Sequence, residues 1–281
     1  MTEKIEVRVA DADEVAELLR WAGTEGWNPG LGDAEAFRAA DPQGFLGSFV
    51  DGRLAAGISA IRYGECFGFI GLYICHPDFR GRGLGMKVWN EGMERLAERT
   101  IGLDGVPAQQ ANYSAMGFNT AYTTARWSGR SQTTHPQNLE GVVPFQAAMA
   151  NAVEAFDRRF FPGPRRHFLD AWLLPPHRTF LVETGGQLRG YAVVRQCLDG
   201  YKLGPLFAED IDIAIRLFNA CHSISKGAEL HLDVPDRQIQ FSQFLASVGF
   251  TRGFETARMY RGAAPVIEQT GVFAITSLEL G

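Results

Sequence analysis

Cysteine is scarce in this sequence, and the few cysteines follow no metal or disulfide pattern. Cys66, Cys75, Cys197 and Cys221 are spread over 281 residues and form no Cys-x-x-Cys pair. This spacing argues against a zinc site or a disulfide framework and is typical of buried thiols in a reducing compartment. The six histidines are scattered as well, so we expect no metal.

Excess positive charge and long apolar runs are also missing. The chain has 27 Lys and Arg against 32 Asp and Glu, a net charge of −5, which argues against nucleic acid or an anionic membrane as the main partner. No apolar run reaches transmembrane length, and the first six residues contain no apolar signal core. We therefore expect a cytoplasmic protein, monomeric or homodimeric. Its length and its 46% hydrophobic content suffice for two domains.

The most informative segment joins an apolar, strand-like run to a helical pattern through a basic, glycine-rich turn. The run ends with Leu72-Tyr73-Ile74-Cys75, the turn is Arg80-Gly81-Arg82-Gly83-Leu84-Gly85, and the helical pattern follows from Met86. A helix N-terminus offers unpaired backbone N–H groups and a partial positive charge, which favour an anion. The glycines allow close backbone approach, and the arginines add charge. The segment predicts a pyrophosphate cradle.

Two common phosphate-binding motifs do not fit this turn. A Walker loop is absent, and the dinucleotide fingerprint lacks its third glycine. The pattern Arg-x-x-Gly-x-Gly does fit, as Arg80, Gly83 and Gly85, and it resembles the acetyl-CoA-binding motif of the GCN5-related N-acetyltransferases (GNAT superfamily). The resemblance implies acetyl-CoA as co-substrate, bound by residues 80–86. It also implies that backbone N–H groups of residues 72–75 lie beside the thioester as an oxyanion hole.

The order of predicted elements agrees with this resemblance. Residues 4–129 give the order β-α-α-β-β-β-α-β-α-β, which is that of the acetyltransferase family. The second half repeats the first, since Gly249–Arg258 mirrors Gly117–Arg126. The predicted fold class is therefore α/β (α+β), with two tandem GNAT-fold domains, each a mixed, mostly antiparallel sheet flanked by helices.

The polar stretch between the two copies sets the predicted domain boundaries. We expect an N-terminal GNAT domain that binds acetyl-CoA at residues 1–129, a linker at 130–138 and a degenerate GNAT-like domain at 139–281. In the second copy, Pro205 removes a donor where the cradle would lie, and Glu209 and Asp210 add negative charge there. We interpret these two acids as helix-capping residues. Only the first copy is expected to bind the cofactor.

The resemblance also indicates a proton donor for the departing thiolate. The family's usual donor is a tyrosine four residues before a Gly-Phe pair, and Tyr113 stands four residues before Gly117-Phe118. A phenol of pKa about 10 suits protonation of a thiolate of pKa about 8.5. A packed helix aromatic is the alternative for Tyr113. No general base is identified, because Glu65 and His76 are better explained as turn residues. Either an ordered water carries the proton away from the acceptor, or the acceptor arrives neutral.

The acceptor site is expected in the loop at residues 24–32, which overhangs the acceptor in this fold. Trp27 and Asn28 are the candidate acceptor-binding residues, although Trp27 is equally explained as a structural plug. Arg165, Arg166 and Trp172 are assigned either to the pocket or to plain surface and core.

The sequence as a whole predicts an acetyl-CoA-dependent N-acetyltransferase. The acceptor is expected to be a small-molecule amine, acetylated by direct transfer in a ternary complex with Tyr113 as the acid. Three alternatives remain open. One is transfer of a longer acyl group, with Phe69, Tyr73 and Ile74 setting the acyl tunnel. The others are acetylation of a protein N-terminus or lysine, and a CoA sensor without turnover.

Overall fold

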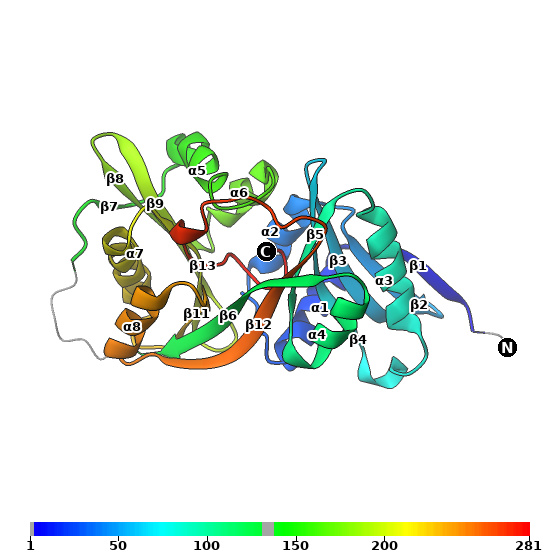
Figure 1. Cartoon of the computed structure of the whole chain (residues 1–281). Coiled ribbons are helices and arrows are strands. Elements are labelled where there is room, and N and C mark those ends of the chain that lie inside the picture. The colour runs from blue at the N-terminus through cyan, green and yellow to red at the C-terminus, as the bar shows by residue number, and fades with distance from the viewer. Residues whose placement is uncertain (1–2, 131–137) are drawn as a thin grey trace.

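The computed structural model describes residues 3–130 and 138–281, and in these two ranges the strands form one continuous sheet. This part of the chain contributes 13 strands, in the order β1-β2-β3-β4-β5-β12-β6-β11-β10-β9-β8-β7, with β13 paired to β10. The two halves of the chain lie side by side, and β6 and β12 run between them (Figure 1). The mixed, mostly antiparallel sheet flanked by helices confirms the predicted fold class.

The first half contains the predicted series of elements in the predicted order. Its strands and helices are β1 (Ile5–Val9), α1 (Ala12–Thr24), α2 (Asp33–Ala40), β2 (Phe45–Val50), β3 (Arg53–Tyr63), β4 (Phe67–Cys75), α3 (Leu84–Arg95), β5 (Thr100–Gly105), α4 (Pro107–Ala115) and β6 (Asn119–Gly129). Helix α1 starts with a capping box made by Asp11 and Glu14, as their spacing predicts.

Helices α1 and α3 cover opposite faces of the first half of the sheet. A Cβ on Gly57 of β3 would stand 2.2 Å from Leu18 of α1, so this helix lies directly on that face. The next residue, Ile58, points the other way, because side chains alternate along a strand. Its side chain lies 3.3 Å from the Cβ position of Gly92 in α3. The sheet of the first half therefore lies between α1 and α3.

The second half follows the same plan. Its elements are β7 (Val142–Pro144), α5 (Ala150–Asp157), α6 (Arg166–Trp172), β8 (Arg178–Thr184), β9 (Gln187–Gln196), β10 (Tyr201–Ala208), α7 (Ile211–Ile224), β11 (Leu230–Pro235), α8 (Ile239–Ser247), β12 (Thr251–Arg261) and β13 (Val272–Ala274). The sequence from Phe145 has an amphipathic helical pattern, but α5 begins only at Ala150, since the backbone of Phe145 still bonds to Thr179 at the sheet edge.

One of the two predicted capping acids of the second half is a cap and the other is not. Asp210 is the N-cap of α7, and its carboxylate accepts a hydrogen bond from the backbone of Ile213. Glu209 instead forms ion pairs with Arg159 and Arg189 at 2.8 Å each. The capping interpretation is therefore wrong for Glu209, because two arginines outside the helix lie within reach of its longer side chain.

Strands β6 and β12, one from each half, are inserted between strands of the other half. Strand β12 pairs with β5 from Ala257–Gly105 to Arg261–Ile101, and it separates β5 from β6. Strand β6 in turn pairs with β11 of the second half. The halves are therefore joined within one hydrogen-bonded sheet rather than only by a linker. Most of the predicted linker, residues 131–137, lies outside the described residues.

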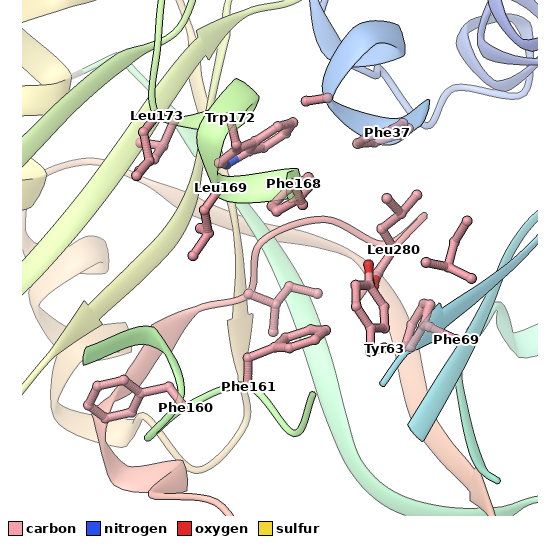
Figure 2. Close-up of a cluster of buried hydrophobic side chains, with 14 of the residues drawn as sticks. Phe37, Tyr63, Phe69, Phe160, Phe161, Phe168, Leu169, Trp172, Leu173 and Leu280 are labelled. Atoms are coloured by element: carbon pink, nitrogen blue, oxygen red, sulfur yellow. The ribbon is translucent and has the colours of Figure 1, made fainter. Parts of the chain in front are cut away.

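A single apolar cluster also spans both halves. Phe37 of α2 stacks on Trp172 of α6 with ring centroids 5.9 Å apart, and Tyr63 of β3 meets Phe161 edge-on at 4.8 Å. Figure 2 shows these rings together with Leu280 between the two halves. Trp172 thus belongs to the core and not to a pocket. Arg165, the other buried candidate of this region, is held by Asp157 in the same interior.

A buried ion pair connects α2 to the second half. Asp33, the first residue of α2, is fully buried, and its carboxylate lies 3.1 Å from Nε of Arg195 and 3.4 Å from Nε2 of His177. Burial alone would raise the pKa of this carboxyl, but Arg195, His177 and the backbone N–H of Gly30 together hold it below its ordinary value. The negative charge of Asp33 is therefore part of the folded state at neutral pH.

We predict that Asp33→Asn lowers the free energy of unfolding by about 3–5 kcal/mol, the usual cost of leaving one partner of a buried pair uncompensated. The folded-state pKa of Asp33 lies below the unfolded value, so its contribution is present above about pH 4 and is lost as the pH falls further. Denaturant unfolding at several pH values measures this. The exposed Asp212→Asn variant is the control, with a change of less than about 1 kcal/mol. A similar small change for Asp33→Asn would contradict the prediction.

Candidate active site

The site begins where β4 and β5 separate. These strands pair in parallel only from Phe67–Thr100 to Ile70–Leu103. Just beyond Ile70, the pairing of β4 with β3 is shifted by a bulge, and Leu72 takes a positive φ of 46°. A bulge of this kind redirects a strand and ends its ladder. Strand β5 therefore offers no partner to residues 72–75, and a gap opens between the two strands.

A cavity of about 540 Å³ occupies this gap, a size in the range of small-molecule sites. It is lined by residues of β4, β5 and α4, of the loops after α1, β4 and β5, and of the second half. They are Glu25, Trp27, Ile70, Gly71, Leu72, Tyr73, Ile74, Cys75, Arg80, Leu103, Asp104, Val106, Gln109, Tyr113, Phe254, Thr256 and Leu278. The structure thus brings the predicted thioester-side strand, the predicted acid and Trp27 to one cavity.

The glycine-rich turn forms an open backbone surface at the start of α3. Gly81 and Gly83 have φ values of 76° and 74°, in the left-handed region that favours glycine. Gly83 is the N-cap of α3, without a side-chain capping hydrogen bond, and a Cβ at either glycine would meet no atom within 4 Å. No side chain therefore covers the backbone at these two glycines, and a ligand can approach it closely. This geometry fits a pyrophosphate.

The two arginines of the turn are paired with carboxylates of the first half. Nη2 of Arg80 lies 2.6 Å from Glu25, its Nε donates to the carbonyl oxygen of Cys75 at 3.1 Å, and Arg82 pairs with Glu3. Both ion pairs are exposed, and pairs of this kind contribute at most about 1 kcal/mol. A phosphate can therefore compete for both arginines.

The other two residues predicted for the cradle differ in exposure. Leu84 is buried in the core and anchors α3, whereas Met86 is exposed on the first turn of the helix. A Cβ on Gly85 would lie 3.0 Å from the hydroxyl of Tyr73, so a larger residue there would crowd the cavity wall.

Tyr113 is held in α4 by aromatic packing. Its ring stacks on Trp89 with centroids 5.5 Å apart and meets Phe118 at 6.3 Å. Burial, with a smaller contribution from Tyr73, raises the pKa of Tyr113 to about 12. The hydroxyl has no hydrogen-bond partner within residues 3–130 and 138–281, and the side chain lines the cavity. The phenol is thus protonated over the physiological range and available as a donor.

The structure separates the two candidate acceptor residues. Trp27 lines the cavity, and its carbonyl oxygen accepts hydrogen bonds from Arg126 at 3.2 Å and Lys202 at 2.9 Å. The side chain of Asn28 instead exchanges two hydrogen bonds with the backbone of Asp199, at 2.8 and 3.1 Å. Asn28 therefore connects the loop to the second half and does not line the cavity.

Sequence reasoning did not identify the residues of the second half that line the cavity. Phe254 and Thr256 belong to β12, and Leu278 belongs to the segment that follows β13. The insertion of β12 beside β5 brings Phe254 and Thr256 there, and no local pattern in the sequence signals that pairing. Asp104, also missed, is the penultimate residue of β5 and accepts two hydrogen bonds of 2.8 Å from Arg258.

The equivalent position of the second half holds a buried strand in place of a cradle. Residues 203–208 are buried in β10, which pairs with β9 and β13. Within the described part of the chain, no cluster of His, Cys, Asp and Glu side chains is arranged to hold a metal ion. The same residues contain no helix long and apolar enough to cross a membrane.

This fold and this cavity define an acyltransferase of the GNAT class. A model described as "Acetyltransferase (GNAT) family" matches residues 12–118, and one described as "Acetyltransferase (GNAT) domain" matches residues 153–274. The chain is 34% identical to holothin acyltransferase of Pseudoalteromonas sp. (strain SANK 73390), over 97% of this chain and 93% of that protein. The chain therefore belongs to the GNAT acyltransferase family, with two tandem GNAT domains.

Other relatives agree with this assignment. The uncharacterized N-acetyltransferase YitH of Bacillus subtilis is 24% identical over 96% of both chains. A putative acetyltransferase from Pyrococcus horikoshii has the same fold, with a TM-score of 0.82 and 19% identity over 100% of this chain and 97% of its own. A tandem GNAT protein from the clavulanic acid biosynthesis pathway gives a TM-score of 0.63 at 14% identity, over 94% of this chain and 100% of its own.

Proposed function

We propose that this protein transfers an acetyl group from acetyl-CoA to the amino group of a small molecule, by direct transfer in a ternary complex. One observation carries the proposal. A single cavity joins the open edge of β4, the hydroxyl of Tyr113 and residues of both halves, and it lies beside an open anion-binding helix N-terminus. The four unpaired cysteines support a reducing, cytoplasmic setting for this activity.

The residues present fit acetyl-CoA, which supplies the activated thioester. The N–H groups at the start of α3 and the side chains of Arg80 and Arg82 hold the pyrophosphate, after the arginines leave Glu25 and Glu3. The backbone of residues 72–75, which lacks a partner in β5, binds the extended part of the cofactor and polarises the thioester carbonyl. Tyr113 donates its proton to the departing sulfur.

The cover over the cavity supports a small acceptor. Trp27 from the first half and Phe254 and Leu278 from the second close the acceptor side, whereas a protein N-terminus or lysine would need an open groove. Transfer of a longer acyl group is the second candidate function, since the relative that is 34% identical is named holothin acyltransferase. Of the three residues predicted to set the acyl tunnel in this alternative, Tyr73 and Ile74 line the cavity. Phe69 is buried in the core and does not line it.

A thiol-release screen tests the proposal. Acetyl-CoA and longer acyl-CoAs are offered with amines, amino acids, polyamines, antibiotics and peptides. We expect thiol release with at least one small amine and acetyl-CoA. A preference for peptides would favour the protein acetyltransferase. Binding of acetyl-CoA without any thiol release would favour a sensor.

A further inference from the structure

A row of charged side chains crosses the sheet from the first half to the second. Asp104 of β5 pairs with Arg258 of β12 at 2.8 Å, and Arg126 of β6 pairs with Asp233 of β11 at 2.8 and 3.0 Å. Each pair is in register across adjacent strands, so both side chains of a pair lie on the same face of the sheet. Lys202 of β10 extends the row and donates to the carbonyl oxygen of Trp27.

The segment of residues 275–281 lies directly on the sheet beside this row. Its first residue, Ile275, donates to the carbonyl oxygen of Asp233 at 3.0 Å. Further along, Ser59 of β3 donates to the carbonyl oxygen of Glu279 at 3.1 Å, and a Cβ on Gly71 would stand 2.0 Å from that same oxygen. The segment thus runs from the second half to β4. Figure 1 shows the end of the chain in the middle of the molecule.

Glu279 has a buried carboxylate without a donor. Its side chain is 1% exposed, and neither carboxylate oxygen has a hydrogen-bond partner among the described residues. Thr256 Oγ1 and Thr124 Oγ1, on facing residues of β12 and β6, are buried and unpaired as well. Unpaired buried oxygens are costly, and ordered water is their usual partner. Each of these oxygens can therefore form a hydrogen bond with an internal water.

Glu279 lies immediately behind the wall of the candidate active site. Its neighbour Leu278 lines the cavity, as do Gly71, which its backbone contacts, and Thr256. Burial raises the pKa of Asp104, and the negative charge of Glu279 adds to this rise, so the two carboxylates are electrostatic neighbours.

The other charged groups near Glu279 lie on strands β5, β6, β9, β10, β11 and β12. Burial lowers the pKa of Arg126, and the carboxylates of Asp233 and Glu279 raise it. Burial lowers the pKa of Lys202, and Glu279 opposes this. The remaining ionisable neighbours on this face are Cys197, Arg195 and Arg258. Asp104 and Asp233 are each held by an arginine, so in the described part of this cluster Glu279 is the carboxylate that lacks a donor.

We propose that Glu279, acting through ordered water beside Thr256, accepts the proton that the acceptor must lose. The inference rests on the proposed function and supplies the base that the sequence did not identify. The other carboxylates of the cavity are Asp104, which accepts two hydrogen bonds from Arg258, and Glu25, which is exposed and pairs with Arg80 until Arg80 binds the pyrophosphate. The second half would then complete the chemistry of a site whose cofactor cradle lies in the first.

The acceptor ammonium gives one proton to the Glu279 carboxylate through water, and the neutral amine then attacks the thioester carbon. The new C–N bond forms, the C–S bond breaks, and Tyr113 protonates the thiolate. The nitrogen gives its second proton to the Tyr113 phenolate, and Glu279 returns its proton to solvent. The products are the amide, free CoA and one proton.

Three variants of the full-length chain test this proposal: Glu279→Gln, Glu279→Asp and, as a distant control, Glu65→Gln. Turnover is measured with saturating acetyl-CoA and the best amine across the neutral pH range. We expect Glu279→Gln to lower kcat by about 10²-fold and to remove the acidic limb of the kcat profile. Glu279→Asp should keep that limb, and Glu65→Gln, at an exposed turn, should behave as wild type. Calorimetric titration should give the same acetyl-CoA affinity for all four proteins.

Two results overturn this inference: a wild-type kcat in Glu279→Gln, or a lowered kcat with the acidic limb unchanged, which would indicate a structural role. If the wild type acylates no amine, the proposed function fails separately. A pH-difference infrared spectrum then reads the carboxyl without turnover. A carboxyl band that changes with pH in wild type and in Glu65→Gln, and is missing in Glu279→Gln, supports Glu279 as the proton acceptor. The same band in all three proteins contradicts it.

Discussion

Replacing Tyr113 with phenylalanine is expected to lower kcat by about 10²–10⁴-fold, the usual contribution of a positioned acid. The ring stays stacked on Trp89, because phenylalanine keeps the shape of the side chain and removes only the hydroxyl. The affinity for acetyl-CoA should change little. Steady-state turnover and calorimetric titration measure the two quantities on the same preparation.

The pH dependence provides a second readout for Tyr113. Because burial raises its pKa to about 12, the phenol remains protonated well above neutral pH. We therefore expect no loss of kcat on the alkaline side that depends on Tyr113 up to about pH 10. Tyr201→Phe, which removes a hydroxyl from β10, is the matched control. Turnover of Tyr113→Phe within a few fold of wild type would mean that another group protonates the thiolate.

Gly83→Asp is expected to abolish acetyl-CoA binding in a protein that stays folded. A Cβ at Gly83 meets open space, and aspartate tolerates the left-handed backbone better than most residues. It is also a favoured N-cap residue, so the start of α3 should not lose stability. Its carboxylate would stand where the helix N-terminus receives the pyrophosphate, and like charges repel.

Gly83→Asn separates charge from size in this experiment. The two variants have nearly the same shape, but asparagine carries no charge and should therefore bind acetyl-CoA more weakly than wild type yet measurably. Circular dichroism and thermal unfolding control for the fold. Unchanged affinity in Gly83→Asp would show that the motif does not hold the cofactor.

The sequence predicted the parts of this protein that are encoded locally. The strand, the glycine-rich turn and the following helix are contiguous, so the open N-terminus of α3 follows from about fifteen residues. The spacing of Tyr113 from Gly117-Phe118 likewise sets its position at the end of α4, where the structure places it in the cavity. Its role as an acid remains a prediction.

The sequence did not predict features that depend on pairing across the whole chain. The repeat identified two copies of one fold, but it gave no sign that β12 inserts between β5 and β6. This exchange brings Phe254 and Thr256 to the cavity, and the segment after β13 brings Leu278 and Glu279. Asn28 was assigned to the acceptor from its loop alone, and the second half engages its side chain instead.

The central claim is that the chain has one acyl-CoA site, whose cradle lies in the first half. Calorimetric titration of the full-length protein with acetyl-CoA tests it most directly. We predict one molecule bound per chain, because the first half has an open helix N-terminus and the equivalent residues of the second half are buried in β10. Gly83→Asp should remove this single event. Two molecules bound per chain, or one that persists in Gly83→Asp, would contradict the account.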